Sequence, residues 1–234
     1  MPVLRLIKNA ADMVWVTNEL DRWAFVDQNR LKTDKVIAVK GGVDAHAPAL
    51  VPEPRMKQFD AVFVGRLHPR KGLLELIDIW RLVCQIRPDA KLAVIGVGEL
   101  EHEMREMIER YRLTNNIFLL GFRDGIEKIE IFKQSRVVVH PATYDSGGMA
   151  ACEAMACGFP GVSFDLDSLR SYYPKGMIKT PCYDLRRFAQ NMVELLNNHE
   201  LYLKIANDAM DLAKQWDWDL RAEELAEAIE SLFA

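Results

Sequence analysis

The sequence has 234 residues, half of them apolar, and its 30 basic and 34 acidic side chains give a formal net charge of −4. No apolar run is long enough to cross a bilayer, and no secretory signal pattern is present, so we expect no membrane-spanning segment. The acidic balance argues against an extended nucleic-acid surface. Any positive charge that binds an anionic ligand must therefore be local.

Four cysteines, Cys84, Cys152, Cys157 and Cys182, bear on the redox compartment. They form no CxxC pair, and no histidines stand near them at the spacing of a zinc site. Most of them fall in apolar helix or strand contexts, which is typical of reduced core thiols. We therefore expect a cytoplasmic protein.

The first 45 residues contain little regular structure. Residues 13–16 and 36–39 are short apolar runs typical of strands, and residues 18–30 between them predict a helix. A loop rich in glycine and proline follows. Two short strands and one helix bury too little apolar surface to form a core of their own.

From residue 61 onward, strands and helices alternate in a way that predicts an α/β domain, with a parallel sheet flanked by helices. The expected strands are residues 61–64, 91–97, 116–120, 136–140, 160–164 and 176–179. The expected helices are residues 73–86, 99–112 and 124–134, followed by 184–198, 199–215 and 217–233. The last three helices make the carboxyl terminus helical.

The loop after the fourth of these strands contains a glycine turn that starts a helix. In an open parallel sheet such a loop lies at the carboxyl edge of the strands, where ligands bind. The amides of Gly147, Gly148 and Met149 would point out of the helix amino terminus, which suits phosphate oxygens. Asp145 stands before the turn and Glu153 on the helix. Acidic residues near a helix amino terminus are also favourable without any ligand, so both readings stay open.

A second loop, Gly65-Arg-Leu-His-Pro-Arg-Lys-Gly72, places cations where a helix begins. Arg70 and Lys71 oppose the helix macrodipole there, which disfavours cations by about 0.3–1 kcal/mol. A bound anion reverses the sign of that interaction, so the placement favours a phosphate ligand. The alternative is that these residues are ordinary solvated surface.

Together, the two loops resemble the signatures of the retaining GT-B glycosyltransferases of family 4, also called group 1. Asp145 and Glu153, with seven residues between them and Ala154-Met-Ala-Cys-Gly-Phe-Pro160 after them, resemble the family's E-x7-E segment. Asp145 stands where the family usually has glutamate. The loop from Gly65 to Gly72 resembles the family's Gly-Arg-Leu-x-x-x-Lys-Gly signature. The resemblance covers nearly the whole chain from Asp12 onward.

The resemblance implies a role for each matched residue. Arg66 and Lys71 would neutralise the diphosphate of a nucleotide-sugar donor. Glu153 would hold the ribose hydroxyls, and Asp145 would lie against the transferred sugar. We therefore expect Asp145, Arg66 and Lys71 to be catalytic, with no metal. The residues expected to bind the donor are Gly65, Gly96, Gly98, Gly121, Phe122, Ser146, Gly147, Gly148, Met149 and Glu153.

Some of these assignments depend on weaker signals. Ile95-Gly-Val-Gly-Glu99 resembles a nucleotide loop, but two glycines also make an ordinary tight turn. Leu120-Gly-Phe122 resembles the stretch where the family's backbone reads the base, and is otherwise a strand end. Asp165-Leu-Asp167 matches the metal-binding triplet of the other glycosyltransferase fold, GT-A, but we expect it to cap a helix that starts near Ser168. His140 either reaches a donor sugar or fills space.

The resemblance also implies how the chain is divided. Residues 1–45 are similar to the end of an amino-terminal acceptor domain and the start of a linker. Residues 46–215 are similar to the donor-binding Rossmann-like domain, and residues 216–234 to a helix that crosses back toward the amino-terminal part. We therefore expect the carboxyl-terminal half of a two-domain enzyme, inactive by itself. The alternative is a small amino-terminal extension of a complete protein.

The function implied by the resemblance is sugar transfer from a nucleotide-diphospho-sugar to an acceptor, with retention of the anomeric configuration. We expect no cofactor and no nucleic-acid partner, and the acceptor is a glycan, a lipid or a small molecule. Peripheral membrane association through the amino-terminal domain that the resemblance implies is a further alternative. Two alternatives stay open: a nucleotide-sugar-binding module without transfer activity, and a GT-B-like epimerase that acts on the nucleotide sugar itself.

Overall fold

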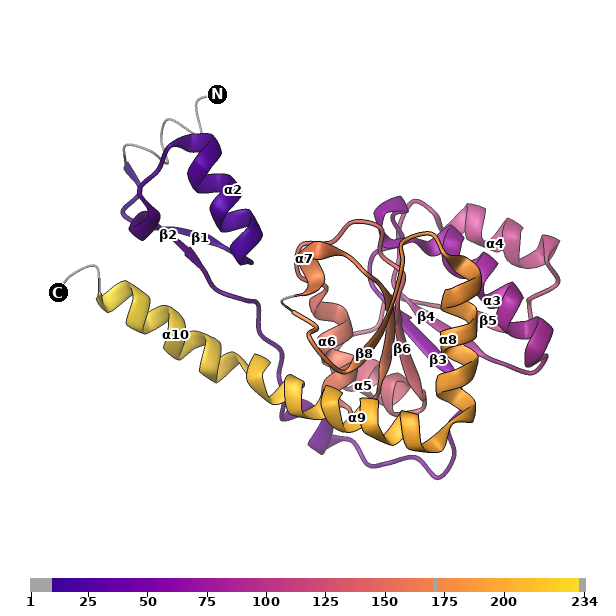
Figure 1. The fold of residues 1–234 in the computed structure, drawn as a ribbon. Coiled ribbons are helices and arrows are strands. Elements are labelled where there is room, and N and C mark those ends of the chain that lie inside the picture. The colour runs from indigo at the N-terminus through magenta and orange to yellow at the C-terminus, as the bar shows by residue number, and fades with distance from the viewer. Residues whose placement is uncertain (1–9, 171, 232–234) are drawn as a thin grey trace.

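The computed structural model describes residues 10–170 and 172–231, which form a small amino-terminal unit and a larger α/β domain (Figure 1). The small unit pairs β1 (Val14–Val16) with β2 (Val36–Ala38) in parallel, and α2 (Glu19–Asn29) lies between them in the chain. These elements occur where the sequence predicted a strand, a helix and a strand.

A parallel sheet of six strands forms the α/β domain, which confirms the predicted fold class. The strands are β3 (Ala61–Val64), β4 (Leu92–Ile95), β5 (Ile117–Gly121), β6 (Val137–His140), β7 (Gly161–Phe164) and β8 (Met177–Thr180). Their order in space is β5-β4-β3-β6-β7-β8, with every neighbouring pair parallel. The direction of winding reverses between β3 and β6. Ligands bind at such a switch point, outside the carboxyl ends of the strands.

Helices cover both faces of this sheet (Figure 1). The first face packs against α3 (Leu73–Ile86), α4 (Glu101–Arg110) and α8 (Leu185–Asn197), and the second against α5 (Gly125–Lys133), α6 (Met149–Ala156) and α9 (His199–Ala213). Side chains of a strand alternate between the two cores: Ala61 and Phe63 belong to the first, and Val62 to the second. Because both faces are buried, the strands read as continuous apolar runs.

The last helix, α10 (Trp218–Glu230), leaves the α/β domain and runs toward β1 and β2 (Figure 1). Its start is fastened to the segment that follows β2. Val43 N donates to Trp216 O at 2.7 Å, and Trp218 N donates to Val43 O at 3.2 Å. The Trp216 side chain is buried in the second core. This contact joins the amino-terminal unit to the α/β domain.

The bounds of the elements are mostly narrower than predicted. The helix predicted for residues 199–215 ends at Ala213, and a 3-10 turn (Lys214–Trp216) separates it from α10. The helix predicted up to residue 233 is described to Glu230, and residues 232–233 lie outside the described part. The helix expected near Ser168 is the single turn α7 (Asp167–Arg170). No helix in the described part of the chain is long and apolar enough to cross a membrane.

The connections that follow β3 and β6 pack against each other at the switch point. The carbonyl oxygen of Arg70 accepts hydrogen bonds from Thr143 N at 3.0 Å and Tyr144 N at 3.2 Å. Gly72 has a φ of 66°, and a Cβ atom added there would lie 1.9 Å from Pro141 O. Glycine is required at this position both for its backbone conformation and for the close approach of the connection after β6.

Replacement of Gly72 by alanine should therefore destabilise the protein more than its left-handed conformation alone explains. Gly125 is a matched control, since its φ is 53° but an added Cβ would meet nothing within 4 Å. We expect Gly125→Ala to cost about 1 kcal/mol and Gly72→Ala about 1–3 kcal/mol more, from overpacking against backbone. Urea unfolding measures both. If the two variants lose the same free energy of unfolding, the contact with Pro141 relaxes without cost.

Candidate functional site

Two cavities lie at the carboxyl edge of the sheet and share Arg66. The first, of about 450 Å³, is lined by residues from the connections after β3, β4 and β5 and from α5 and α6: Val64, Gly65, Arg66, Ile95, Gly96, Val97, Phe122, Arg123, Asp124, Lys128, Ala150 and Glu153. The second, of about 480 Å³, is lined by Arg66, His68, Arg70, Lys71, Tyr144, Asp145 and Ser146. The tertiary structure thus brings the two sequence motifs to one groove, with Arg66 between the cavities.

Cations without carboxylate partners occur in this groove. Among the described residues, no acidic side chain forms an ion pair with Arg66 or Arg70. The guanidinium of Arg70 instead lies 4.7 Å from the centre of the Tyr144 ring. Positive charge that is not neutralised within the protein favours an anionic ligand at the point where the two cavities meet.

Asp145 is the most heavily engaged side chain of the groove, with 8% of its side chain exposed. Its Oδ2 lies 2.5 Å from Lys71 Nζ and 3.3 Å from His140 Nε2. Its Oδ1 accepts hydrogen bonds from Gly147 N at 3.2 Å and Gly148 N at 2.9 Å. The prediction that these two amides point freely toward a phosphate is therefore wrong for this structure, because the short Asp145 side chain folds back onto them.

These contacts determine the charge state of Asp145. Burial raises the pKa of a carboxyl group, but the neighbouring imidazole of His140 and the hydrogen bond and positive charge of Lys71 outweigh it. The pKa of Asp145 is therefore held well below its usual range. Asp145 is ionised at any physiological pH and acts as a fixed negative charge beside Lys71.

Glu153 lies at the other end of the groove, on α6, with 37% of its side chain exposed to the first cavity. Lys128 Nζ on α5 lies 3.1 Å from Glu153 Oε1 and 3.0 Å from its Oε2, and 2.9 Å from Asp124 Oδ1. Burial lowers the pKa of Lys128, but its bonds to Asp124 and Glu153 outweigh that effect and raise it. Sequence reasoning missed Lys128, because a single lysine on an amphipathic helix carries no distinguishing pattern.

The glycines of the predicted site have different surroundings. Gly65 and Gly96 line the first cavity, and a Cβ atom on Gly96 would lie 1.9 Å from Gly65 O. Gly98 packs against the backbone of Leu67, and neither Gly98 nor Gly121 lines either cavity. Gly98 is thus a packing glycine of a tight turn. Gly121 has a φ of 71° and leads into Phe122, which lines the cavity with 66% of its surface exposed.

The remaining predicted donor-binding residues belong to the loop between β6 and α6. Ser146 lines the second cavity. Its carbonyl oxygen accepts a hydrogen bond from Asn18 Nδ2 at 3.0 Å, which ties the loop to the start of α2. Met149 begins α6, and its side chain lies beside Gly41. The loop is thus held by the amino-terminal unit as well as by its own domain.

The aspartates of the D-x-D triplet lie outside the groove, and Asp167 is the first residue of the single turn α7. Arg170 occupies both carboxylates: it contacts Asp165 Oδ1 at 3.1 Å and Oδ2 at 2.9 Å, and Asp167 Oδ1 at 2.8 Å. A guanidinium fork satisfies two carboxylates in this way because it presents several donors in one plane. Neither aspartate lines either of the cavities above.

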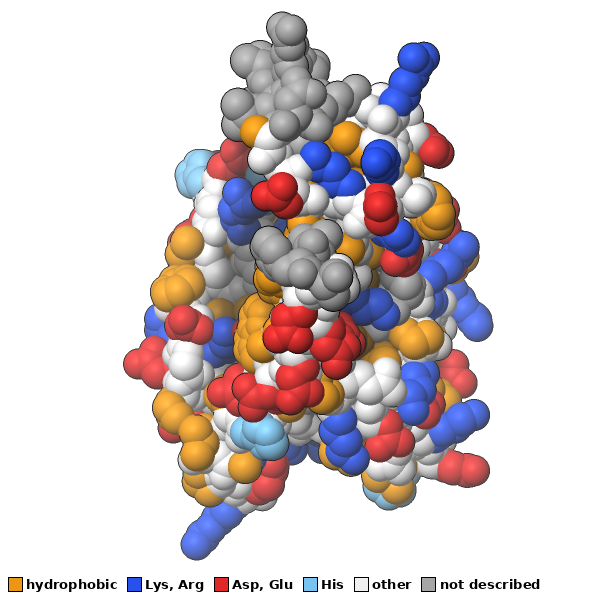
Figure 2. Space-filling view, turned by 90° about the vertical axis from the view of Figure 1, so that its left-hand side faces the viewer, with side chains coloured by type: hydrophobic (Ala, Val, Ile, Leu, Met, Phe, Trp, Pro, Cys, Tyr) orange, Lys and Arg blue, Asp and Glu red, His pale blue; other side chains and the backbone are white. Residues whose placement is uncertain are grey.

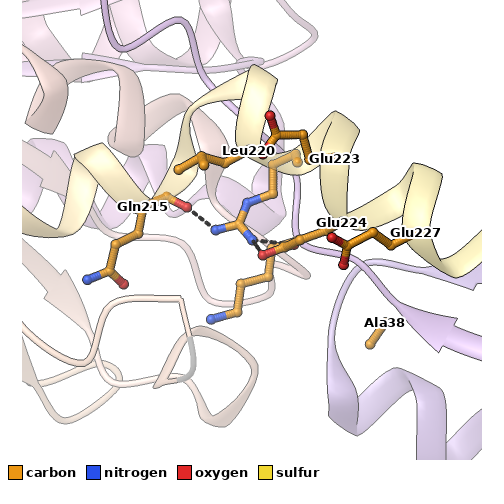
Figure 3. Close-up of a pocket in the computed structure, with 8 residues that line it drawn as sticks. Ala38, Gln215, Leu220, Glu223, Glu224 and Glu227 are labelled. Carbon is orange, nitrogen blue, oxygen red and sulfur yellow. Dashed lines mark hydrogen bonds and ion pairs between the residues drawn. The ribbon is translucent and has the colours of Figure 1, made fainter.

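A further cavity, of about 600 Å³, lies between α10 and the segment after β2, away from both motifs (Figure 3). Glu223, Glu224 and Glu227 line it together with Lys40 and Arg221, and Arg221 already contacts Glu224 and the carbonyl oxygen of Gln215. Acidic side chains also gather on the face shown in Figure 2. This cavity therefore does not suit an anionic ligand, and the groove at the sheet edge is the better candidate.

A protein-family model described as Glycosyl transferases group 1 matches residues 51–211. A poly(glycerol-phosphate) alpha-glucosyltransferase of Bacillus subtilis is 24% identical over 208 residues, which cover 84% of this chain and 31% of the relative. A phosphatidyl-myo-inositol mannosyltransferase of Mycobacterium leprae is 29% identical over 190 residues, covering 80% of this chain and 50% of the relative. The chain thus spans half the length or less of these two relatives.

Solved structures share the fold. Anabaena Alr3699/HepE, in complex with UDP and glucose, has a TM-score of 0.84 at 21% identity, over 98% of this chain and 66% of that one. The pneumococcal O-GlcNAc transferase GtfA, in complex with UDP and GlcNAc, has a TM-score of 0.83 at 17% identity, over 98% of this chain and 47% of that one. The expected GT-B-type fold is therefore confirmed. The family model spans most of the sequence and contains both motifs, so the chain belongs to the group 1 glycosyl transferases.

Proposed function

We propose that this chain binds a nucleotide-diphospho-sugar in the groove at the sheet edge and is the donor-binding half of a retaining family 4 glycosyltransferase. The observation that carries the proposal is the convergence of both motifs on one groove, with Arg66 unneutralised where the two cavities meet. The nucleoside would occupy the cavity lined by Phe122 and Glu153. The diphosphate would lie at Arg66, and the sugar in the cavity lined by Asp145.

The chemistry assigned to these residues is electrostatic. When the bond between the sugar and the diphosphate breaks, the leaving diphosphate takes the bonding electron pair and gains negative charge. Arg66 stabilises that charge best because nothing in the described structure neutralises it beforehand. Lys71 stabilises that charge less, since it is already paired with Asp145. We propose no metal in this scheme.

The two curated relatives are named for a glycerol-phosphate polymer and a phosphatidylinositol as the molecules they glycosylate. We propose a hydroxyl acceptor carried by a glycan, a lipid or a small molecule, and bound outside the α/β domain. UDP is the first nucleotide to test, because the two structural neighbours were solved with it.

The first prediction concerns the diphosphate. UDP, GDP or ADP should bind more tightly than the matching monophosphate, and Arg66→Ala should weaken diphosphate binding by about 1.5–3 kcal/mol, as expected for a charge-assisted hydrogen bond. Arg105→Ala is the matched control, because Arg105 pairs with Glu101 on the surface of α4. Titration calorimetry measures each affinity. Equal affinities of the native chain for mono- and diphosphates would refute the assignment.

A second prediction tests the ribose contact. Glu153→Gln keeps the shape of the side chain but removes its charge, so binding of the nucleoside diphosphate should weaken by about 1–3 kcal/mol. The 2′-deoxy ligand should bind the native chain less tightly and lose little more in the variant, because both changes delete the same bond. Unfolding should hardly change, since Lys128 keeps Asp124 as a partner. If Glu153 is structural, stability falls instead and the ribose and deoxyribose ligands bind equally.

The third prediction concerns metal. Because Arg170 already occupies Asp165 and Asp167, donor binding should keep its affinity when EDTA is added. Thermal-shift titrations with and without the chelator measure this. Loss of binding with EDTA, restored by manganese, would bring the D-x-D triplet into the site.

A further inference from the structure

Lys71 and the amides of Gly147 and Gly148 are partners suited to a phosphate, yet an internal carboxylate occupies them. The Asp145 side chain contacts all three groups and is nearly buried. When a donor enters the groove, Lys71 and these amides are therefore already bound to the negatively charged carboxylate of Asp145.

The backbone of this loop is fixed from several sides. The carbonyl oxygen of Asp145 accepts a hydrogen bond from Ser168 Oγ at 2.5 Å, that of Ser146 from Asn18, and that of Gly148 from the hydroxyl of Tyr173. These contacts fix the backbone at Asp145, and the carboxylate itself is held by Lys71 Nζ and by the amides of Gly147 and Gly148. Its charge therefore stays at this point of the groove when a ligand binds.

His140 supports the Asp145 carboxylate from the buried side. Its side chain is 4% exposed, and its Nε2 lies 3.3 Å from Asp145 Oδ2. That nitrogen has no well-aligned hydrogen-bond partner among the described residues. The imidazole lies next to the ring of Tyr173, with 6.4 Å between the ring centres, and Tyr173 also binds Gly148 O. His140 is thus placed to hold Asp145 when a ligand phosphate draws Lys71 away.

A fixed negative charge at this point acts differently on a donor and on its product. The outer phosphate of a nucleotide sugar is joined to the inner phosphate by an anhydride and to the sugar by an ester, and it carries one negative charge. The terminal phosphate of a free nucleoside diphosphate has a second ionisation, which for phosphate monoesters has a pKa of about 6. It therefore carries up to one more negative charge near pH 7. Asp145 repels that extra charge across a short, partly desolvated distance.

We propose that Asp145 is a specificity-determining residue that disfavours the free nucleoside diphosphate relative to its sugar ester, and that His140 is the positioning residue that keeps Asp145 in place. This inference depends on the proposed function, because it needs the diphosphate to lie at Arg66 and Lys71. Its consequence is easier release of the nucleotide product. Asp145 would thus promote turnover through its charge, in addition to any contact with the sugar.

Asp145→Asn tests the first half of the proposal, because asparagine retains an oxygen for the two amides but removes the charge and the acceptor that Lys71 uses. Affinities for UDP, GDP and ADP, and for the sugar ester of whichever binds, are measured by calorimetry at pH 7.5. We expect the affinity for the nucleoside diphosphate to rise about tenfold or more, and the affinity for the sugar ester to rise less. Asp165→Asn, the same charge change outside the groove, should leave both affinities unchanged.

The outcomes separate this inference from the proposed function. A native chain that binds a nucleoside diphosphate, with an Asp145→Asn variant that binds it equally or less tightly, overturns the role of Asp145 alone. If neither protein binds any of the three diphosphates, the proposed function fails and this inference fails with it. Asp145→Glu, which keeps the charge, should keep the native affinity. Asp145→Ser replaces Asp145→Asn if thermal unfolding shows that the asparagine variant does not fold.

The role of His140 is tested by a double-mutant cycle. His140→Leu should raise the affinity for the nucleoside diphosphate by less than Asp145→Asn does, and should add nothing when Asp145 is already asparagine. His140→Gln, which can donate to Asp145 Oδ2, should restore the native affinity. A purely structural histidine would instead change the affinity by the same factor in both backgrounds. That result would overturn the positioning role.

Discussion

The partly buried contact between Lys71 and Asp145 joins two loops that belong to neighbouring strands of the sheet. It connects residues 74 positions apart in the chain, at the one place where the order of the strands reverses. The close approach of Gly72 to Pro141, and the hydrogen bonds to Arg70 O, hold the same two loops together. Because an ion pair partly shielded from water requires well-placed partners on both sides, the shape of the groove depends on this contact.

The distribution of charge follows from that arrangement. The protein has a net charge of −4, and acidic side chains are gathered on the face shown in Figure 2. At the sheet edge, however, Asp145 and Glu153 are each paired with a lysine, while Arg66 has no acidic partner among the described residues. The groove is therefore the candidate site for an anion on an acidic protein. The overall composition alone would not suggest such a site.

Both carboxylates of the central motif are already engaged before any ligand is present, and they are engaged differently. Asp145 is nearly buried and its pKa is held well below the usual range, so it is a fixed charge. Glu153 remains partly exposed to the cavity and is held by Lys128 alone among the groups described around it. One carboxylate is thus suited to shaping the electrostatics of the groove, and the other to accepting hydrogen bonds from a ligand.

The sequence by itself determined the parallel sheet, the place of almost every element, and the two motifs in their order. These features depend on local properties: runs of apolar residues set the strands, and glycine and proline set the turns between them. Only the tertiary structure decided that Asp145 occupies the amides of Gly147 and Gly148, that Lys128 faces Glu153, and that Arg170 holds the D-x-D aspartates. The physical reason is that ion pairs and hydrogen bonds depend on separations of a few ångströms, which the packing of helices and loops fixes and which leave no periodic trace along the chain.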